Sequence, residues 1–171
     1  MKPLPLEPIL VRMIEDIQAL KLNDPLIIGI HTGGAWIAQC LHDELGVRSE
    51  LGSLDISFYR DDFSRVGLNP KVKSSDLPES VENREILLVD DVLHTGRTIR
   101  AALNEIFSFG RPTRVKLAVA LERPGRELPI CADVRGVYLE LKQSEQAKIS
   151  QQNDGLVFHI VEQTTASGPA S

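Results

Sequence analysis

The segment that most constrains the fold is the run Ile86-Leu87-Leu88-Val89, which is followed at once by two acidic residues. Four consecutive apolar residues of this kind are typical of a strand that is buried on both faces, as in parallel sheets. Similar apolar runs occur at residues 26–30 and 115–121, and helical patterns separate the runs. This alternation predicts an α/β fold with a central, mainly parallel sheet flanked by helices.

The rest of the chain divides into helical patterns, one further strand and a long polar stretch. Residues 60–84 carry no sustained apolar period and predict a loop or arm, which at such a length is usually functional or disordered. We expect one domain over residues 1–161 and a frayed tail over residues 162–171. The predicted helices cover residues 8–20, 36–45 and 99–107, and the further strand covers residues 51–59.

Composition narrows the class of function. The chain has 171 residues and a net charge of -5, which is the wrong sign for a protein that only binds nucleic acid. Its two cysteines, Cys40 and Cys131, form neither a disulfide framework nor a zinc motif. No apolar run approaches the roughly 20 residues that span a bilayer, and the N-terminus lacks the apolar core of a signal peptide. We therefore expect a cytoplasmic protein that acts on small molecules.

The acid pair and the short loop after it carry the chemistry. Ligands bind at the carboxyl ends of parallel strands, and the N-terminus of the next helix favours a phosphate. Thr95 and Thr98 offer hydroxyl donors, and Gly96 lets the backbone bend towards an anion. Asp90 and Asp91 would repel a bare phosphate, so they suit adjacent sugar hydroxyls or a magnesium ion held by the ligand. Together these parts predict a site for a ribose 5-phosphate.

A structural alternative exists for the same residues. Asp90 and Asp91 on their own are explained by capping of the turn, and Thr98 by capping of the helix. The complete pattern over residues 86–98 favours the ligand site, although it is neither a Walker A loop nor a Gly-x-Gly-x-x-Gly motif. His94 in this loop is expected to pack rather than to act as an acid or base, and Trp36 is expected in the core.

Residues 86–98 resemble the phosphoribosyl pyrophosphate motif of type I phosphoribosyltransferases. Residues 29–34, 55–62 and 110–133 resemble the PyrR family, and the likeness covers roughly residues 8–148. The resemblance implies a parallel sheet with flanking helices, a small hood and a flexible β-arm. It also implies the conversion of uracil and phosphoribosyl pyrophosphate (PRPP) to UMP and pyrophosphate, with Mg²⁺ chelated by PRPP rather than by protein ligands. Regulation of pyrimidine operons through leader RNA, and a homodimer or higher homo-oligomer, are implied as well.

The resemblance also assigns roles to residues. The implied catalytic residues are Asp90, Asp91 and Arg60, and the arm that closes over substrate begins with Arg60, Asp61 and Asp62. The implied binding residues are Asp90, Asp91, His94, Thr95, Gly96, Arg97 and Thr98 for the ribose and 5-phosphate, His31, Thr32, Gly33 and Gly34 for pyrophosphate, and Asp133 and Val134 for the base.

The sequence departs from the family pattern in two places. Many PyrR sequences have Lys-Thr-Arg-Gly or Arg-Thr-Arg-Gly where this chain has His31-Thr32-Gly33-Gly34, so two cationic side chains are replaced. The hood lacks an aromatic residue and a lysine that many relatives have after Asp133, which leaves a different base as one alternative. The other alternative is an RNA-binding attenuator that senses UMP or UTP with weak or no turnover. Its candidate RNA face comprises Arg111, Arg114, Lys116, Arg123 and Arg126.

Overall fold

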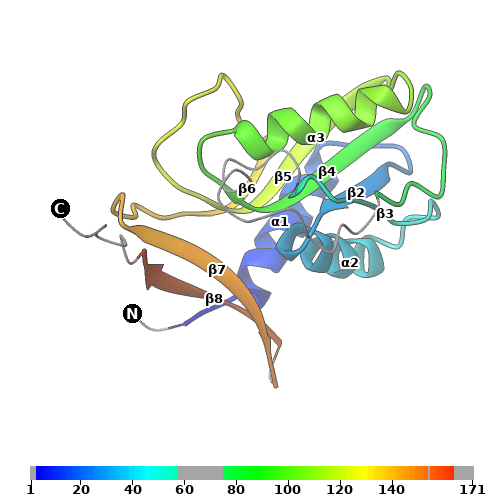
Figure 1. The fold of residues 1–171 in the computed structure, drawn as a ribbon. Helices are drawn as coiled ribbons and strands as arrows, with labels where there is room; N and C mark the ends of the chain where they lie inside the picture. The colour runs from blue at the N-terminus through cyan, green and yellow to red at the C-terminus, as the bar shows by residue number, and fades with distance from the viewer. Residues whose placement is uncertain (1–2, 58–74, 154, 164–171) are drawn as a thin grey trace.

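A five-stranded parallel sheet forms the centre of the computed structural model, which describes residues 3–57, 75–153 and 155–163 (Figure 1). The strand order is β3-β2-β4-β5-β6, so the chain crosses over between β3 and β4. Every residue of β2 is buried, as expected for an inner strand covered on both faces. The strands are β2 (Leu26–Ile30), β3 (Gly52–Leu54), β4 (Glu85–Leu93), β5 (Arg114–Glu122) and β6 (Val134–Tyr138).

Helices cover both faces of this sheet (Figure 1). On one face, α1 (Glu7–Ala19) and α2 (Gly33–Leu45) bury apolar side chains such as Met13 and Ile37 in a core that includes Leu87. On the other face, α3 (Arg97–Ser108) packs Ile99 and Ile106 against strand residues that include Leu88. Successive residues of β4 thus enter opposite cores, because side chains alternate across a strand.

A small antiparallel sheet lies beside the main one. It has the order β1-β8-β7 and comprises β1 (Leu4–Pro5), β7 (Glu145–Gln152) and β8 (Gly155–Glu162). Phe158 on β8 is fully buried and belongs to the core beneath α1 and α2, so it anchors this sheet to the domain. We call β1, β7 and β8 the hood. Figure 1 shows β7 and β8 as a long hairpin outside the parallel sheet.

The predicted fold class and helices are confirmed, with two corrections to strand lengths. Of the strand expected over residues 51–59, the described part forms a strand only at β3, because the Ser57 N–H donates to Asp55 Oδ1 at 2.9 Å and the chain turns; residues 58 and 59 lie outside the described residues. The strand expected to end at Val89 continues to Leu93, because Asp90 and Leu93 still pair with β5. The acid pair therefore lies within a strand and not in a loop.

Some predictions fall partly outside the described residues. Residues 58–74, which contain most of the expected arm, lie there, and so do residues 164–171 of the expected tail. β8 ends at Glu162, so the first residue of that tail is within a strand, and the domain boundary stays a prediction. Among the residues that the structure describes, no helix is long and apolar enough to cross a membrane.

Candidate functional site

A cavity of ≈ 490 Å³ opens at the carboxyl end of β4. The N-terminus of α2 and the acid pair lie on it together, because β2 and β4 are neighbours with Gly29 opposite Val89. The hood forms another wall through β7. The lining residues are Thr32, Gly33 and Trp36 from the α2 region, Asp90, Asp91 and Val92 from β4, His94, Thr98, Arg123, and residues 146–149 from β7.

The two carboxylates are held in fixed orientations. Asp90 is 2% exposed, and its Oδ1 accepts a hydrogen bond from the Asp91 N–H at 2.9 Å. Asp91 Oδ1 accepts one from the Val92 N–H at 2.9 Å. Both carboxylates line the cavity. Carboxylate oxygens accept hydrogen bonds from hydroxyl groups, and this role for the pair stays a prediction.

Gly33 and Gly34 allow α2 to start directly against the acid pair. A Cβ at Gly34 would lie 2.7 Å from the Val89 carbonyl oxygen and 2.9 Å from Asp90 Cα, which is too close for any side chain. A Cβ at Gly33 would lie 2.7 Å from Asp91 Cγ and 2.5 Å from Ile149 Cγ2. The first turn of α2, with its unpaired N–H groups, therefore faces the cavity next to Asp91.

The segment after β5 satisfies the carbonyl groups at the end of β4 and in the loop that follows it. Leu93 O accepts a hydrogen bond from the Arg123 N–H at 3.0 Å, and His94 O accepts one from the Arg126 guanidinium. Thr95 O accepts bonds from the N–H groups of residues 127 and 128 at 3.0 and 3.1 Å. Because the segment after β5 satisfies these carbonyls, the N-terminus of α3 is left to meet an anion.

Two residues shape this loop by their conformation and packing. Gly96 has φ +93°, a left-handed conformation that favours glycine, and it caps α3. The His94 ring packs against Gly125, where a Cβ would lie 2.6 Å from Nε2. Burial lowers the pKa of His94 below 6.5, and the Arg123 cation lowers it further. His94 is therefore a neutral packing residue at pH 7, as the sequence predicts.

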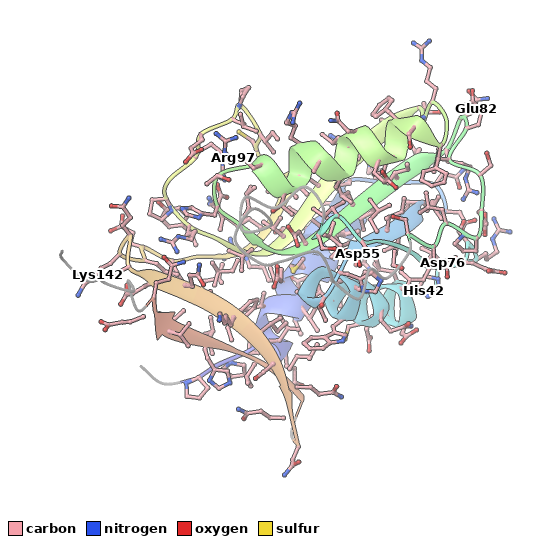
Figure 2. The ribbon with its side chains drawn as sticks, viewed as in Figure 1. His42, Asp55, Asp76, Glu82, Arg97 and Lys142 are labelled. Carbon is pink, nitrogen blue, oxygen red and sulfur yellow. The ribbon has the colours of Figure 1, made fainter. Side chains whose placement is uncertain are left out.

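Not every predicted site residue lines the cavity. Among residues 94–98, His94 and Thr98 do, whereas Thr95 Oγ1 accepts from the Arg97 N–H at 3.2 Å and Arg97 Nε pairs with Glu127 at 2.7 Å. The Arg97 side chain lies at the start of α3 (Figure 2).

The predicted pyrophosphate segment, residues 31–34, also lies only partly on the cavity. Thr32 and Gly33 line the cavity, and the peptide bond before Thr32 is cis. The His31 ring, by contrast, lies 3.0 Å from Ser53 Oγ.

The base pocket expected at Asp133 and Val134 does not coincide with this cavity. Val134 begins β6 and pairs with Ala118 in the middle of β5, level with Val89 of β4. The Asp133 carboxylate is engaged by Lys116 Nζ at 2.7 Å and by the Leu117 N–H at 2.9 Å. Neither residue lines the cavity.

Three predicted residues cannot be placed, and others were missed. Arg60, Asp61 and Asp62 lie outside the described residues. Trp36, expected in the core, is half-buried and lines the cavity. Arg123 was assigned to a candidate RNA face, but it is only 5% exposed and lines the cavity. The position of Arg123 directly after a central parallel strand is a signal that could have placed it at the site.

The comparisons with known proteins agree with this geometry. Residues 7–150 match the family described as the phosphoribosyl transferase domain. The chain is 58% identical over 140 residues to the "Bifunctional protein PyrR" of Nitrosococcus oceani, covering 81% of this chain and 78% of that protein. It is 53% identical over 130 residues to the protein of the same name from Pseudomonas entomophila, covering 76% of each chain.

Solved structures show the same fold. A hypoxanthine phosphoribosyltransferase from Staphylococcus aureus superposes with a TM-score of 0.61 at 23% identity, covering 81% of this chain and 77% of that one. A purine phosphoribosyltransferase from Pyrococcus horikoshii has a TM-score of 0.57 at 22% identity, with 78% and 80% covered. Fold, site geometry and sequence identity lead to one conclusion: the chain belongs to the PyrR family of phosphoribosyltransferases.

Proposed function

We propose that this chain is a uracil phosphoribosyltransferase, which converts uracil and PRPP to UMP and pyrophosphate. The observation that carries the proposal is the placement of Asp90 and Asp91 on one cavity between two helix N-termini. Carboxylates suit ribose hydroxyls, and each helix N-terminus suits a phosphate group. One cavity thus offers matching groups for all three parts of PRPP.

The ligand is assigned to these groups by charge. The start of α3, with Thr98, receives the 5-phosphate, and the start of α2, with Thr32, receives the pyrophosphate. Asp90 and Asp91 accept hydrogen bonds from the ribose hydroxyls between them. In the expected arm, Arg60, Asp61 and Asp62 close over the ligand, and Arg60 takes part in catalysis. Closure excludes water, which would otherwise hydrolyse the activated sugar.

The reaction needs electrostatic stabilisation and no covalent intermediate. The bond between uracil N1 and ribose C1 forms, the bond from C1 to the pyrophosphate oxygen breaks, and the N1 proton is released. The sugar gains oxocarbenium character, so the fixed carboxylates of Asp90 and Asp91 stabilise the developing positive charge.

Magnesium enters as part of the substrate in this proposal. Within residues 3–57, 75–153 and 155–163, no three His, Cys, Asp or Glu side chains are grouped to hold a metal ion. Carboxylate oxygens are nevertheless ligands that Mg²⁺ accepts, often in small number and alongside substrate phosphates. Asp90 and Asp91 therefore fit an ion that PRPP carries, which would neutralise the leaving pyrophosphate.

A panel of nucleobases tests the proposal. The protein is incubated with Mg²⁺, PRPP and uracil, cytosine, hypoxanthine, guanine or adenine, and the nucleotide products are quantified. We expect UMP as the main product. Turnover of another base alone would transfer the proposal to that base, and this control is necessary because neither Asp133 nor Val134 lines the cavity. No nucleotide above background with any base would reject the enzymatic function.

The second candidate function is regulation of pyrimidine operons through leader RNA, which the relatives' name "Bifunctional protein PyrR" favours. Four of the five basic residues expected on an RNA face are engaged elsewhere: Arg123 is buried, Lys116 pairs with Asp133, Arg114 pairs with Glu85 at 2.6 Å, and Arg126 pairs with Glu122. Filter binding to a pyrimidine leader RNA across a salt series tests this function, since phosphate contacts must weaken with salt. Affinity equal to that for an unrelated RNA would reject it.

Two further proposals concern assembly and location. We propose a homodimer or a higher homo-oligomer, and light scattering after size-exclusion chromatography measures it directly. The cytoplasm is the proposed location, because PRPP and nucleobases are intracellular metabolites. Cell fractionation with an antibody against the chain checks this.

A further inference from the structure

Arg123 is a buried cation on the wall of the cavity. It follows β5 directly, is 5% exposed, and is tied by its backbone N–H to Leu93 O at 3.0 Å. Its guanidinium donates to two backbone carbonyls where the hood begins, those of Lys142, at 2.9 Å, and Glu145. The Nε–H is buried without a hydrogen-bond partner in the part of the chain that the structure describes. Figure 2 labels Lys142 at this end of the molecule.

The neighbouring arginines differ from Arg123 in one respect. Arg126 and Arg135 both pair with Glu122, and Arg97 pairs with Glu127. Arg123 has no carboxylate within 4.0 Å among the described residues, although it is the most buried of the four. Carbonyl dipoles solvate the guanidinium in part, but they do not cancel its charge. A buried charge without a counter-ion is costly, so its retention beside a cavity calls for a reason.

We infer that Arg123 supplies positive charge to the phosphoribosyl site, and that the anionic ligand is its counter-ion in the complex. The inference rests on the proposed function, because it takes the ligand to be a sugar phosphate. The planar guanidinium can bond two carbonyls of the hood while its charge stays available, which a lysine does less well. Arg123 acts through its electric field and its hold on β7, so it is a positioning residue rather than a catalytic one.

The position of Arg123 compensates for the uncharged pyrophosphate segment. Gly33 carries no side chain, and Asp91 and Ile149 occupy the space that a longer residue at this position would enter. The other cation on the cavity wall is Lys148, which is exposed on β7 and therefore better screened by solvent. Arg123 is thus the buried source of positive charge among the described residues that line the cavity.

The test separates charge from shape. Three variants are compared with the wild type: Arg123→Gln and Arg123→Met remove the charge, and Arg123→Lys retains it. Arg135→Gln is the matched control, because Arg135 is exposed at the same end of the sheet, pairs with Glu122 and does not line the cavity. Trp36 is the single tryptophan and lines the cavity, so its fluorescence reports binding. The ligands are PRPP with Mg²⁺, UMP and the neutral nucleoside uridine.

We expect the neutral variants to bind UMP and PRPP at least about tenfold more weakly, since a unit charge several ångströms from a phosphate contributes more than 1.4 kcal/mol at an effective dielectric constant near 20. Uridine binding is expected to change less than about twofold. Arg123→Lys should lose less than about threefold for every ligand. Removal of the cation should also raise the pKa of His94, which NMR titration measures.

Other outcomes overturn the inference in recognisable ways. Unchanged UMP and PRPP affinity in both neutral variants would refute it. Equal losses of affinity for uridine and UMP would leave Arg123 only a structural role. The same conclusion would follow if Arg123→Lys and Arg123→Gln lost affinity equally and amide exchange over residues 145–149 became faster. If one neutral variant fails to fold, the other is used for the comparison. If both neutral variants fail to fold, a need for charge is supported only if Arg123→Lys folds, binds both ligands tightly and has the His94 pKa of the wild type. Failure of the wild type to bind either ligand would reject the proposed function itself.

Discussion

Substitution of Gly33 by alanine gives a sharp test of the site, because the structure shows which atoms the added methyl group would contact. Its Cβ would lie 2.7 Å from Asp91 Cγ and 2.5 Å from Ile149 Cγ2, and Asp91 Oδ2 would be closer still. Ordinary contact begins near 3.4 Å, so the Asp91 carboxyl group must retreat by at least about 0.7 Å. The movement also strains the bond that Asp91 Oδ1 accepts from the Val92 N–H.

A displacement approaching 1 Å in a catalytic group costs about 100-fold in rate, or about 2.7 kcal/mol of transition-state stabilisation. We therefore expect Gly33→Ala to lower kcat/KM for PRPP about 100-fold. Overpacking should cost about 1–3 kcal/mol of folding stability. Steady-state kinetics with the preferred base and thermal unfolding measure the two effects separately.

Gly46, at the other end of α2, is the matched control. It has φ +61° and a Cβ there would meet nothing within 4 Å, so Gly46→Ala introduces backbone strain without a clash. It should lose about 1 kcal/mol of stability and keep its kcat/KM. Activity of Gly33→Ala within about threefold of the wild type would refute the reasoning, because Asp91 would then tolerate displacement or α2 would move instead.

Three further predictions follow from named residues. Asp91→Asn should lower kcat/KM about 100-fold or more with a melting temperature within about 2 °C of the wild type, because it removes charge and preserves shape; wild-type rates would make the acid pair structural. Phe158→Ala should cost about 3–5 kcal/mol in denaturant unfolding, because Phe158 is fully buried and anchors the hood; a cost below about 1 kcal/mol would contradict that. Burial lowers the pKa of His94 below 6.5, so the unfolded state binds more protons and the free energy of unfolding should fall as the pH drops through 6.5; His94→Asn should lack this part of the pH dependence in calorimetry.

Local patterns of apolar residues predict the central helices and strands well, but they place the end of a strand wrongly where polar residues lie inside it. The helix at the N-terminus was predicted over residues 8–20 and found at Glu7–Ala19, since its apolar spacing serves a single buried face. The end of β4 was placed too early, because Asp90 and Asp91 interrupt an apolar run while their backbone continues to pair with β5. Hydrogen-bonded pairing with a neighbouring strand is not visible in one segment of sequence.

The site shows the same division. Asp90, Asp91 and Thr98 were predicted because an acid pair and a Thr/Gly loop follow a buried parallel strand and open a helix, and Thr32 and Gly33 were implied by the resemblance to the PyrR family. Asp133 precedes a parallel strand and does not line this cavity, so its role at the base stays a prediction. The contribution of β7 could not be predicted in this way, because it depends on a hairpin that folds back over the end of β4. The first lining residue of β7, Gln146, lies 55 residues after Asp91 in the chain.

Ion pairs occur at both edges of the parallel sheet, but two charged side chains at the carboxyl edge differ from the rest. At the amino edge, charged side chains are paired: Arg84 with Glu79 at 2.7 Å, Arg114 with Glu85 at 2.6 Å and Lys116 with Asp133 at 2.7 Å. These pairs are partly exposed, so each contributes at most about 1 kcal/mol. At the carboxyl edge, neither Asp91 nor Arg123 has an ion pair within the described residues, and both line the cavity. Neutralising one member of an amino-edge pair should therefore alter stability slightly and leave substrate affinity unchanged. The same change at Asp91 or Arg123 should alter affinity or turnover, because in the proposed complex the ligand interacts with both side chains.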